Sequence, residues 1–347
     1  MLNFVFIAGL AAGLALLLSW GIRTLPSERW QMLAVVPIAK TTDSSWRGMN
    51  LTYYGFFSAT GTTFGIGIML LLLASIHAPI VVGIALVLMV GVVCVPASRL
   101  IARAVERKRN TFTIAGAAFV AALILPWLAI ALCWKFPAIA SPLQILAATG
   151  IGYALGESIG RLACLSFGCC YGIPLHQARP FIARLFEKRN LVLHGATKKA
   201  AYASGLAGEP LVPVQAITSG VFAAAGVAGC ALFLTGSFRL AALIPCLGVW
   251  LWRACSEWLR ADYRGASRVS AYQVMSVFAA AYSTAFIALL PSAAPGATPD
   301  LQAALAHVNT AATLPTLQIV WLALFLYYGR SRVTASLLSF HVVRENV

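Results

Sequence analysis

A carboxylate, a guanidinium and a thiol recur at helical spacing near the middle of the chain. Glu157, Arg161, Cys164 and Gly168 are separated by four, three and four positions, which places them on one stripe of an α-helix. The sequence around them is apolar, and charged side chains inside a membrane-like helix are costly and usually functional. We interpret this stripe, an ion pair followed by a thiol, as one wall of an active site.

A second set of charged residues occurs late in the chain. Arg253, Glu257, Arg260 and Arg264 are also four, three and four residues apart, so a helix would place them on one face that leads out of the membrane. The spacing repeats that of the first set. The alternative is that both sets form ion pairs that only lock helices together in lipid.

Composition indicates what kind of protein must position these residues. Of the 347 residues, 60% are hydrophobic and 10% are charged, whereas soluble domains contain about 45–50% apolar and about 25% charged residues. Nine apolar runs of about twenty residues are long enough to cross a bilayer as helices. The predicted spans are 2–22, 51–75, 79–97, 111–133, 143–163, 212–235, 238–259, 270–291 and 314–329. The sequence therefore predicts an all-α polytopic integral membrane protein with a single membrane domain, 1–347, whose first span is retained rather than removed as a signal peptide.

The basic residues lie between the predicted spans. The net charge is +15, with 25 Lys and Arg, but these residues are spread over short loops and form no basic domain for nucleic acid. Nearly all of them lie in 23–50, 98–110, 164–211, 260–269 and 330–347. The positive-inside rule places these segments in the cytoplasm, with the N-terminus outside and the C-terminus inside. We expect a multi-pass protein of the plasma or inner membrane that binds no nucleic acid.

The longest polar interval is 172–210. It combines many basic residues with Phe, Leu and Val, a composition that suits the membrane surface, where cations attract anionic lipid headgroups. We interpret it as a basic amphipathic loop or lid over the membrane domain.

The eight cysteines indicate neither a disulfide framework nor a metal site. Most lie within the predicted spans, where a free cysteine acts as a small hydrophobe. Cys164, Cys169 and Cys170 are not spaced as a paired C-x-x-C motif, and no histidine follows at zinc-finger distance. The prediction is that the protein binds no metal and no cofactor.

Two tyrosines open the span 51–75. Tyr53 fits the interfacial aromatic belt that flanks many membrane helices. For Tyr54, which precedes Gly55, helix packing and contact with a lipid headgroup are both open.

Taken in order, these elements resemble the prolipoprotein diacylglyceryl transferase family, membrane enzymes that move diacylglycerol from phosphatidylglycerol to a lipoprotein cysteine. The matching pieces are Tyr54-Gly55, the signature helix Gly160-Arg161 with Gly168 and Gly172, Pro213-x-Gln215, and Arg253-x-x-x-Glu257-x-x-Arg260 with Asp262. The resemblance covers 50–290. It implies a seven-helix transferase-like core with one extra helix at each end.

The family's His-Gly-Gly before the third core helix has no counterpart here, and its active site includes that histidine. The general base is therefore open between Glu157, Glu257 and His194. A covalent nucleophile, Cys164 or Cys170, is the alternative. The acceptor is then a lipoprotein cysteine, another thiol or another group.

The resemblance implies a phosphatidylglycerol-like donor whose phosphodiester is bound by arginines. Arg161, Arg253 and Arg260 would bind the anion through charge-assisted, bidentate hydrogen bonds, and Glu157 and Glu257 would orient them. The same guanidinium groups would stabilise the departing phosphate as a glycerol carbon–oxygen bond breaks. The candidate catalytic residues are Arg161, Arg253, Glu157 and Glu257, and the candidate substrate-binding residues are Tyr54, Arg260, Cys164, Gly168, Gly172, Gln215 and Arg264.

Two other functions fit the same sequence. A lipid transporter or scramblase could use the polar stripe as a pathway, and a non-catalytic membrane subunit could keep the fold without the chemistry. The membrane side of the site is also open. The family acts at the outer face, whereas the charge rule places Arg260 and 172–210 on the cytoplasmic side.

Overall fold

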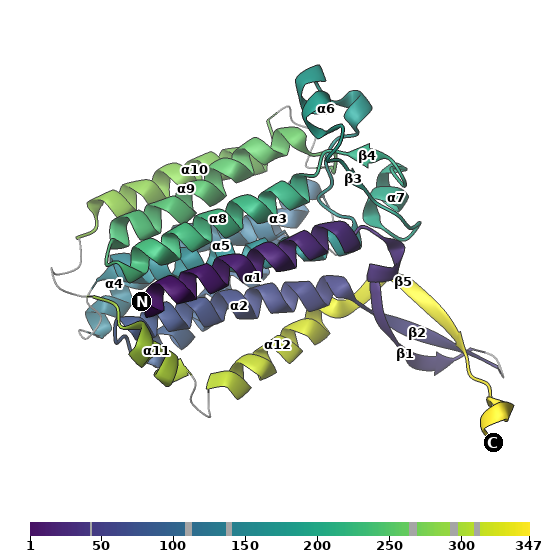
Figure 1. Cartoon of the computed structure of the whole chain (residues 1–347), viewed down its shortest axis with the longest axis horizontal. Helices are drawn as coiled ribbons and strands as arrows, with labels where there is room; N and C mark the ends of the chain where they lie inside the picture. Colours follow the sequence, from purple (N-terminus) through teal and green to yellow (C-terminus); the bar gives the residue numbers. More distant parts are fainter. Residues whose placement is uncertain (42–43, 108–112, 137–140, 264–268, 292–297, 309–312) are drawn as a thin grey trace.

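The protein is a bundle of long helices with a small cap at one end (Figure 1). The computed structural model describes residues 1–347 apart from 42–43, 108–112, 137–140, 264–268, 292–297 and 309–312. The long helices are α1 (Leu2–Thr24), α2 (Tyr53–Ser75), α3 (Ile80–Glu106), α4 (Ile114–Lys135), α5 (Pro142–Phe167), α8 (Val214–Leu234), α9 (Phe238–Ser256), α10 (Ala271–Leu289) and α12 (Thr313–Gly329). A short helix, α11 (Leu301–Val308), lies near the N-terminus at the other end.

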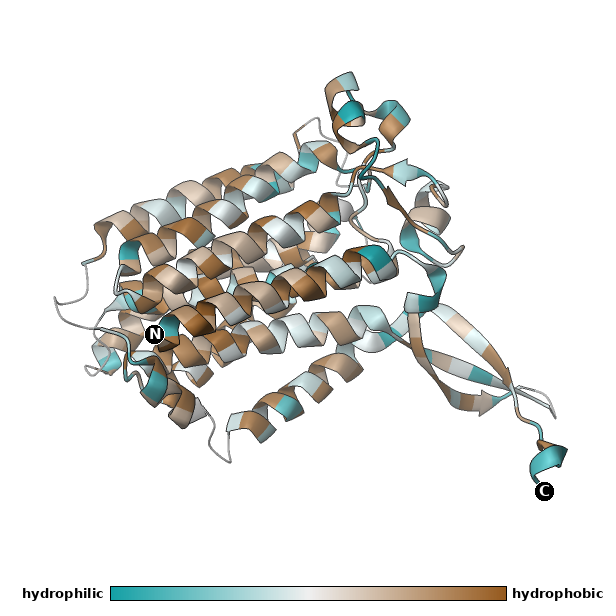
Figure 2. Cartoon of the chain, in the orientation of Figure 1, coloured by the Kyte–Doolittle hydropathy of each residue, from teal (hydrophilic) through white to brown (hydrophobic). Residues whose placement is uncertain are grey.

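The prediction of an all-α polytopic membrane protein is confirmed. Seven of the described helices, α1, α2, α3, α4, α8, α9 and α10, are long and apolar enough to cross a membrane. Figure 2 shows apolar residues along the bundle and hydrophilic residues gathered towards its ends and the cap. A helix forms at each of the nine predicted spans, but two of these helices, α5 and α12, are not both long and apolar enough to be counted among the seven. The helix α12 has only 17 residues, and α5 is less apolar because it carries glycines, polar residues and an ion pair.

The helix α5 lies at the centre of the bundle, where it contacts α1, α2, α4, α8 and α9. Of its 26 residues, 19 are buried. A helix enclosed by other helices does not have to present an apolar surface to lipid, so it can carry charged side chains on an inward face. The central position of α5 therefore explains why its composition departs from that of the surrounding spans.

Glycines let α2 and α5 pack closely. A Cβ atom at Gly61 would lie 2.5 Å from the carbonyl oxygen of Gly156, and one at Gly65 would lie 2.5 Å from that of Gly152. Both helices thus present small residues four positions apart, the arrangement that brings membrane helices into backbone contact. This contact uses one face of α5 and leaves the face with Glu157 directed towards other helices.

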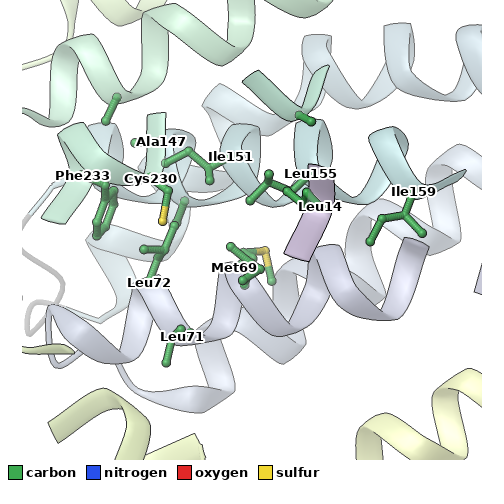
Figure 3. Packing of buried hydrophobic residues seen from close by; sticks show 14 of the residues in the cluster. Leu14, Met69, Leu71, Leu72, Ala147, Ile151, Leu155, Ile159, Cys230 and Phe233 are labelled. Atoms are coloured by element: carbon green, nitrogen blue, oxygen red, sulfur yellow. The ribbon is translucent and has the colours of Figure 1, made fainter. Parts of the chain in front are cut away.

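The apolar core forms between α1, α2, α5 and α8. Figure 3 shows Met69 and Leu72 of α2 near Ile151 and Leu155 of α5, and the core also includes Phe233 of α8. Leu72, Ile151, Leu155 and Phe233 have no exposed surface. This packing holds the central helix in a fixed position, as a site built on its side chains requires.

The cap contains strands that the sequence analysis described as loops. The segments 23–50 and 330–347 contribute β1 (Met32–Lys40), β2 (Ser45–Thr52) and β5 (Arg330–Ser339), which form an antiparallel sheet in the order β1-β2-β5. The interval 172–210, interpreted as a basic amphipathic loop or lid, folds into short helices and strands. They are η2 (Leu175–Gln177), α6 (Pro180–Phe186), β3 (Leu191–Val192), α7 (Lys199–Ser204) and β4 (Pro210–Leu211). Strand and helix here depend on contacts with distant segments, which local sequence does not reveal.

Candidate functional site

Two arginines from different helices share one carboxylate. In α5, the Nη2 atom of Arg161 lies 2.7 Å from Oε2 of Glu157. In α9, the Nη2 atom of Arg253 lies 2.9 Å from the same oxygen. The three side chains are 9–13% exposed. The structure therefore brings together three of the four predicted catalytic residues, Glu157, Arg161 and Arg253, which we call the Glu157 cluster.

The Glu157 cluster carries more positive than negative charge. Among the residues that the structure describes, no second carboxylate pairs with Arg161 or Arg253. The Nε atoms of both arginines are buried without a hydrogen-bond partner in the same part of the chain. Unpaired buried donors and an uncompensated charge are costly. An anion bound at this cluster would neutralise the excess charge and accept hydrogen bonds from the unpaired Nε atoms.

Aromatic rings surround the two guanidinium groups. The Phe222 ring lies 6.0 Å from the guanidinium carbon of Arg161 and 5.6 Å from that of Arg253. Arg253 also lies 5.9 Å from the ring of Trp250 and donates a hydrogen bond to the Tyr153 hydroxyl. Cation–π contacts hold a guanidinium without neutralising it, so the positive charge remains available to a ligand.

Arg260 belongs to a different, saturated cluster. Its Nε and Nη2 atoms each lie 2.8 Å from an oxygen of Asp262, which is a bidentate pair, and its Nη1 lies 3.8 Å from Glu257. Glu257 also accepts a hydrogen bond of 2.9 Å from Ser270. We call Glu257, Arg260 and Asp262 the Asp262 cluster; counting the described residues alone, it has two carboxylates for one guanidinium.

The predicted common face of Arg253, Glu257 and Arg260 is formed only in part. The α-helix α9 ends at Ser256 and continues as the 3₁₀-helix η3 (Glu257–Leu259), after which Arg260 has an extended backbone. Glu257 and Arg260 still face each other, with 3.8 Å between Oε1 and Nη1. Arg253 pairs with Glu157 instead of Glu257, and Arg264 lies outside the described residues.

Three thiols meet where α5 ends. The Sγ atoms of Cys164, Cys169 and Cys170 all lie within 4.8 Å of one another, and those of Cys164 and Cys170 are 3.9 Å apart. We call these residues the thiol cluster. The linear spacing of these three cysteines argued against a metal site, but the chain turns back on itself at Gly168, with φ +71°, and Cys170, with φ +56°, and so brings the thiols together. Positive φ is rare for a residue other than glycine.

Two predicted binding residues flank the thiol cluster. Tyr54 interacts electrostatically with all three cysteines, and its ring lies 5.6 Å from that of Phe167. Gln215, in the first turn of α8, donates a hydrogen bond of 3.0 Å from Nε2 to the carbonyl oxygen of Cys169. Its Oε1 is buried without a hydrogen-bond partner among the described residues.

The two predicted binding glycines have structural roles. Gly168 ends α5 in a left-handed conformation, and a Cβ atom there would lie 2.9 Å from the Cβ of Lys198. A Cβ atom at Gly172 would collide with the carbonyl oxygen of Val212. Glycine is needed at both positions because the backbone turns or approaches another segment closely.

A buried lysine attaches the cap to the bundle. Lys198 has no exposed surface, and its Nζ donates hydrogen bonds of 3.0 Å to the carbonyl oxygen of Leu25 and 2.8 Å to that of Ser166. Burial lowers the pKa of Lys198 to about 8, with Glu28 opposing the shift. Lys198 was predicted to be one of the membrane-surface cations of 172–210, because the residues next to it in the sequence do not predict burial.

An apolar cavity of about 170 Å³ lies beside the Glu157 cluster. The two are separated by aromatic side chains that contact Arg253. It lies between α3, α4, α5, α9 and α10, and its lining includes Ala118, Leu125, Leu146, Val249 and Ile287. Tyr153 and Trp250 also line it, and both contact Arg253. Tyr153 was missed although it precedes Glu157 by four positions and so extends the original stripe; Trp250 had no such signal.

The residues considered as a general base differ in availability. Glu157 is neutralised by two arginines, and Glu257 accepts a hydrogen bond and faces Arg260. His194 is exposed in the cap.

Comparison of the chain with models of known protein families, with curated protein sequences and with solved structures found no match.

Proposed function

We propose that this protein is a phospholipid-dependent transferase of the diacylglyceryl transferase type. It would move a diacylglyceryl, or a related glycerolipid group, from a phosphatidylglycerol-like donor to an acceptor such as a lipoprotein thiol. The observation that carries the proposal is the Glu157 cluster, in which two buried guanidinium groups share one carboxylate. The membrane location and the signature residues around Gly160-Arg161 support the same reading.

The donor phosphate would supply the missing negative charge. Arginine binds phosphate through planar, charge-assisted hydrogen bonds, and the Nε atoms of Arg161 and Arg253 have no partner among the described residues. A phosphodiester carries one negative charge, which balances the excess of one guanidinium in the cluster. The aromatic rings of Phe222 and Trp250 exclude water around these groups and so strengthen the interaction.

The apolar cavity would hold part of an acyl chain. Tyr153 and Trp250 connect it to Arg253, so a lipid with its phosphate at the cluster could extend a chain towards Ala118 and Val249. An acyl chain would exchange lipid contacts for van der Waals contacts with this apolar lining. A headgroup phosphate and an acyl chain would thus be recognised by adjoining parts of one site.

The reaction that fits this arrangement is a displacement at the glycerol carbon of the donor. The acceptor thiol loses its proton to water, and its sulfur forms a bond to that carbon. The carbon–oxygen bond to phosphate breaks, and glycerol phosphate leaves with the bonding electron pair. Arg161 and Arg253 stabilise the charge that develops on the departing phosphate.

The test is incubation of the purified protein with headgroup-labelled phosphatidylglycerol and a membrane extract. We expect release of labelled glycerol phosphate, and loss of that release in Arg161→Ala and Arg253→Ala. The matched control is Arg184→Ala, which changes an exposed arginine of α6. Lipid flux across vesicles without headgroup release would show a transporter or scramblase, and neither activity would show a non-catalytic subunit; both results overturn the proposal.

A further inference from the structure

The thiol cluster has the dimensions of a metal site. A zinc ion lies about 2.3 Å from each sulfur ligand, which places tetrahedrally arranged sulfurs about 3.8 Å apart. The Sγ atoms of Cys164 and Cys170 are 3.9 Å apart, and all three Sγ atoms lie within 4.8 Å of one another. A disulfide would need an S–S separation of about 2.05 Å, and none of the three cysteines forms a disulfide.

The backbone around the thiol cluster is fixed by contacts on several sides. The N–H groups of Gly168 and Cys169 both donate to the carbonyl oxygen of Cys164, at 2.8 and 3.1 Å. Gln215 holds the carbonyl oxygen of Cys169, and Tyr171 accepts a hydrogen bond of 3.0 Å from the backbone of Ala261. These contacts maintain Cys170 in its left-handed conformation, which is a strained arrangement that persists only where the surroundings determine it.

Arginine side chains lie on the side of the cluster that faces α5 and η3. The guanidinium groups of Arg161 and Arg260 both interact electrostatically with Cys170, and Arg161 also interacts with Cys164. Three thiolates and one divalent cation carry a net charge of minus one, which suits a position beside the Glu157 cluster with its excess of one guanidinium. Cys164 and Cys169 are only 6% and 8% exposed, so water competes little for the ion.

We propose that Cys164, Cys169 and Cys170 bind one zinc ion and leave its fourth coordination position open. Three protein ligands with an open position are typical of zinc sites that act on a bound group, whereas structural sites have four. Cys170 is the most exposed of the three, being half-buried, so a ligand would reach a bound ion most easily from its side. Tyr54, which interacts with all three cysteines, flanks it.

The open position has a role in the transfer reaction, and this role rests on the proposed function. An acceptor thiol that binds zinc loses its proton readily, because the metal stabilises the thiolate. Such binding would supply a nucleophile without a strong general base. It would explain how the chain could work without the histidine that the related family uses.

The test measures the metal content of the full chain, purified in detergent without chelators. We expect about one zinc per chain in the wild type and in the Cys255→Ser control, since Cys255 is exposed and lies outside the cluster. Zinc should fall to background in Cys164→Ser and Cys170→Ser. X-ray absorption at the zinc edge should show sulfur neighbours at about 2.3 Å.

A second measurement needs no variant and so is independent of variant folding. Zinc should protect the cluster thiols of the wild type from alkylation until a chelator removes it, whereas Cys255 should react in both states. Copper in place of zinc, a protein that takes up no zinc on titration, or zinc retained after all three cysteines are replaced would overturn the metal site. Zinc bound in a protein that releases no headgroup would reject only the catalytic role.

Discussion

The Glu157 cluster and the Asp262 cluster are both buried arginine sites, but their charge balance is opposite. In the first, two guanidinium groups share one carboxylate; in the second, two carboxylates face one guanidinium. Among the described residues, the first has an unbalanced positive charge and the second does not. If the first binds a phosphate as we propose, the ratio of acids to bases separates a ligand site from a pair of charges that holds the fold together.

The largest effect is expected from loss of an arginine in the Glu157 cluster. Arg253→Ala should lower headgroup release by about 10²–10³-fold, because one donor to the developing phosphate charge is lost. The apparent melting temperature should stay near that of the wild type, since Glu157 and Arg161 then form a balanced pair. Headgroup assays and thermal unfolding of the same preparation check both results. Equal loss of activity in Arg184→Ala would contradict this prediction.

The opposite outcome is expected in the Asp262 cluster. Arg260→Ala removes the guanidinium that pairs with the buried carboxylates of Asp262 and Glu257, which should destabilise the fold by about 3–5 kcal/mol. Headgroup release per folded molecule should remain close to that of the wild type. Thermal unfolding and an activity normalised to folded protein would separate the two effects. A stable variant without activity would place Arg260 among the phosphate-binding residues and break the comparison.

A smaller effect concerns Lys198, which joins the cap to α1 and α5. Because its pKa is lowered from 10.5 to about 8, the unfolded chain holds more protons than the folded chain between these pH values. The free energy of unfolding should therefore rise with pH across this window, by up to about 3 kcal/mol. Lys198→Met should lack this rise, because methionine does not titrate.

The measurement is the difference in unfolding between wild type and Lys198→Met at each pH, so that the other titrating groups cancel. Lys188→Met is the matched control, because Lys188 is an exposed lysine of the same cap. A wild-type stability that falls from pH 8 to pH 10.5 relative to Lys198→Met would show that the fold prefers the charged lysine.

The smallest effect is expected for Glu257→Gln. The bidentate pair of Arg260 with Asp262 remains, and glutamine can still accept a hydrogen bond from Ser270. The loss should be about 1 kcal/mol or less. Glu157→Gln is the contrasting variant, since it leaves two buried guanidinium groups unpaired and should cost about 3–5 kcal/mol. Similar melting temperatures for the two variants would remove the distinction between the clusters.

Sequence predicted the part of the site that lies within one helix. Glu157, Arg161 and Cys164 are on a common stripe because α5 keeps regular α-helical geometry through all of them. Arg253 was identified by its residue type and motif, but its pairing with Glu157 joins positions 96 residues apart. Only the packing of α9 against α5 determines that contact.

The misassigned parts fail for equally specific reasons. No glycine or proline marks the change from α-helix to 3₁₀-helix after Ser256, so the second stripe was drawn too far. The thiol cluster depends on a positive φ at Cys170, a conformation that the residue type does not suggest. The burial of Lys198 depends on carbonyl groups of Leu25 and Ser166, which belong to distant segments.

The most direct test is a structure of the protein in a bilayer that contains phosphatidylglycerol. The account predicts a lipid phosphate bound between Arg161 and Arg253, with oxygen atoms about 2.8 Å from guanidinium nitrogens of both, and an acyl chain beside Tyr153 and Trp250. A phosphate bound at Arg260 instead, or a Glu157 cluster that stays closed in excess lipid, would contradict it.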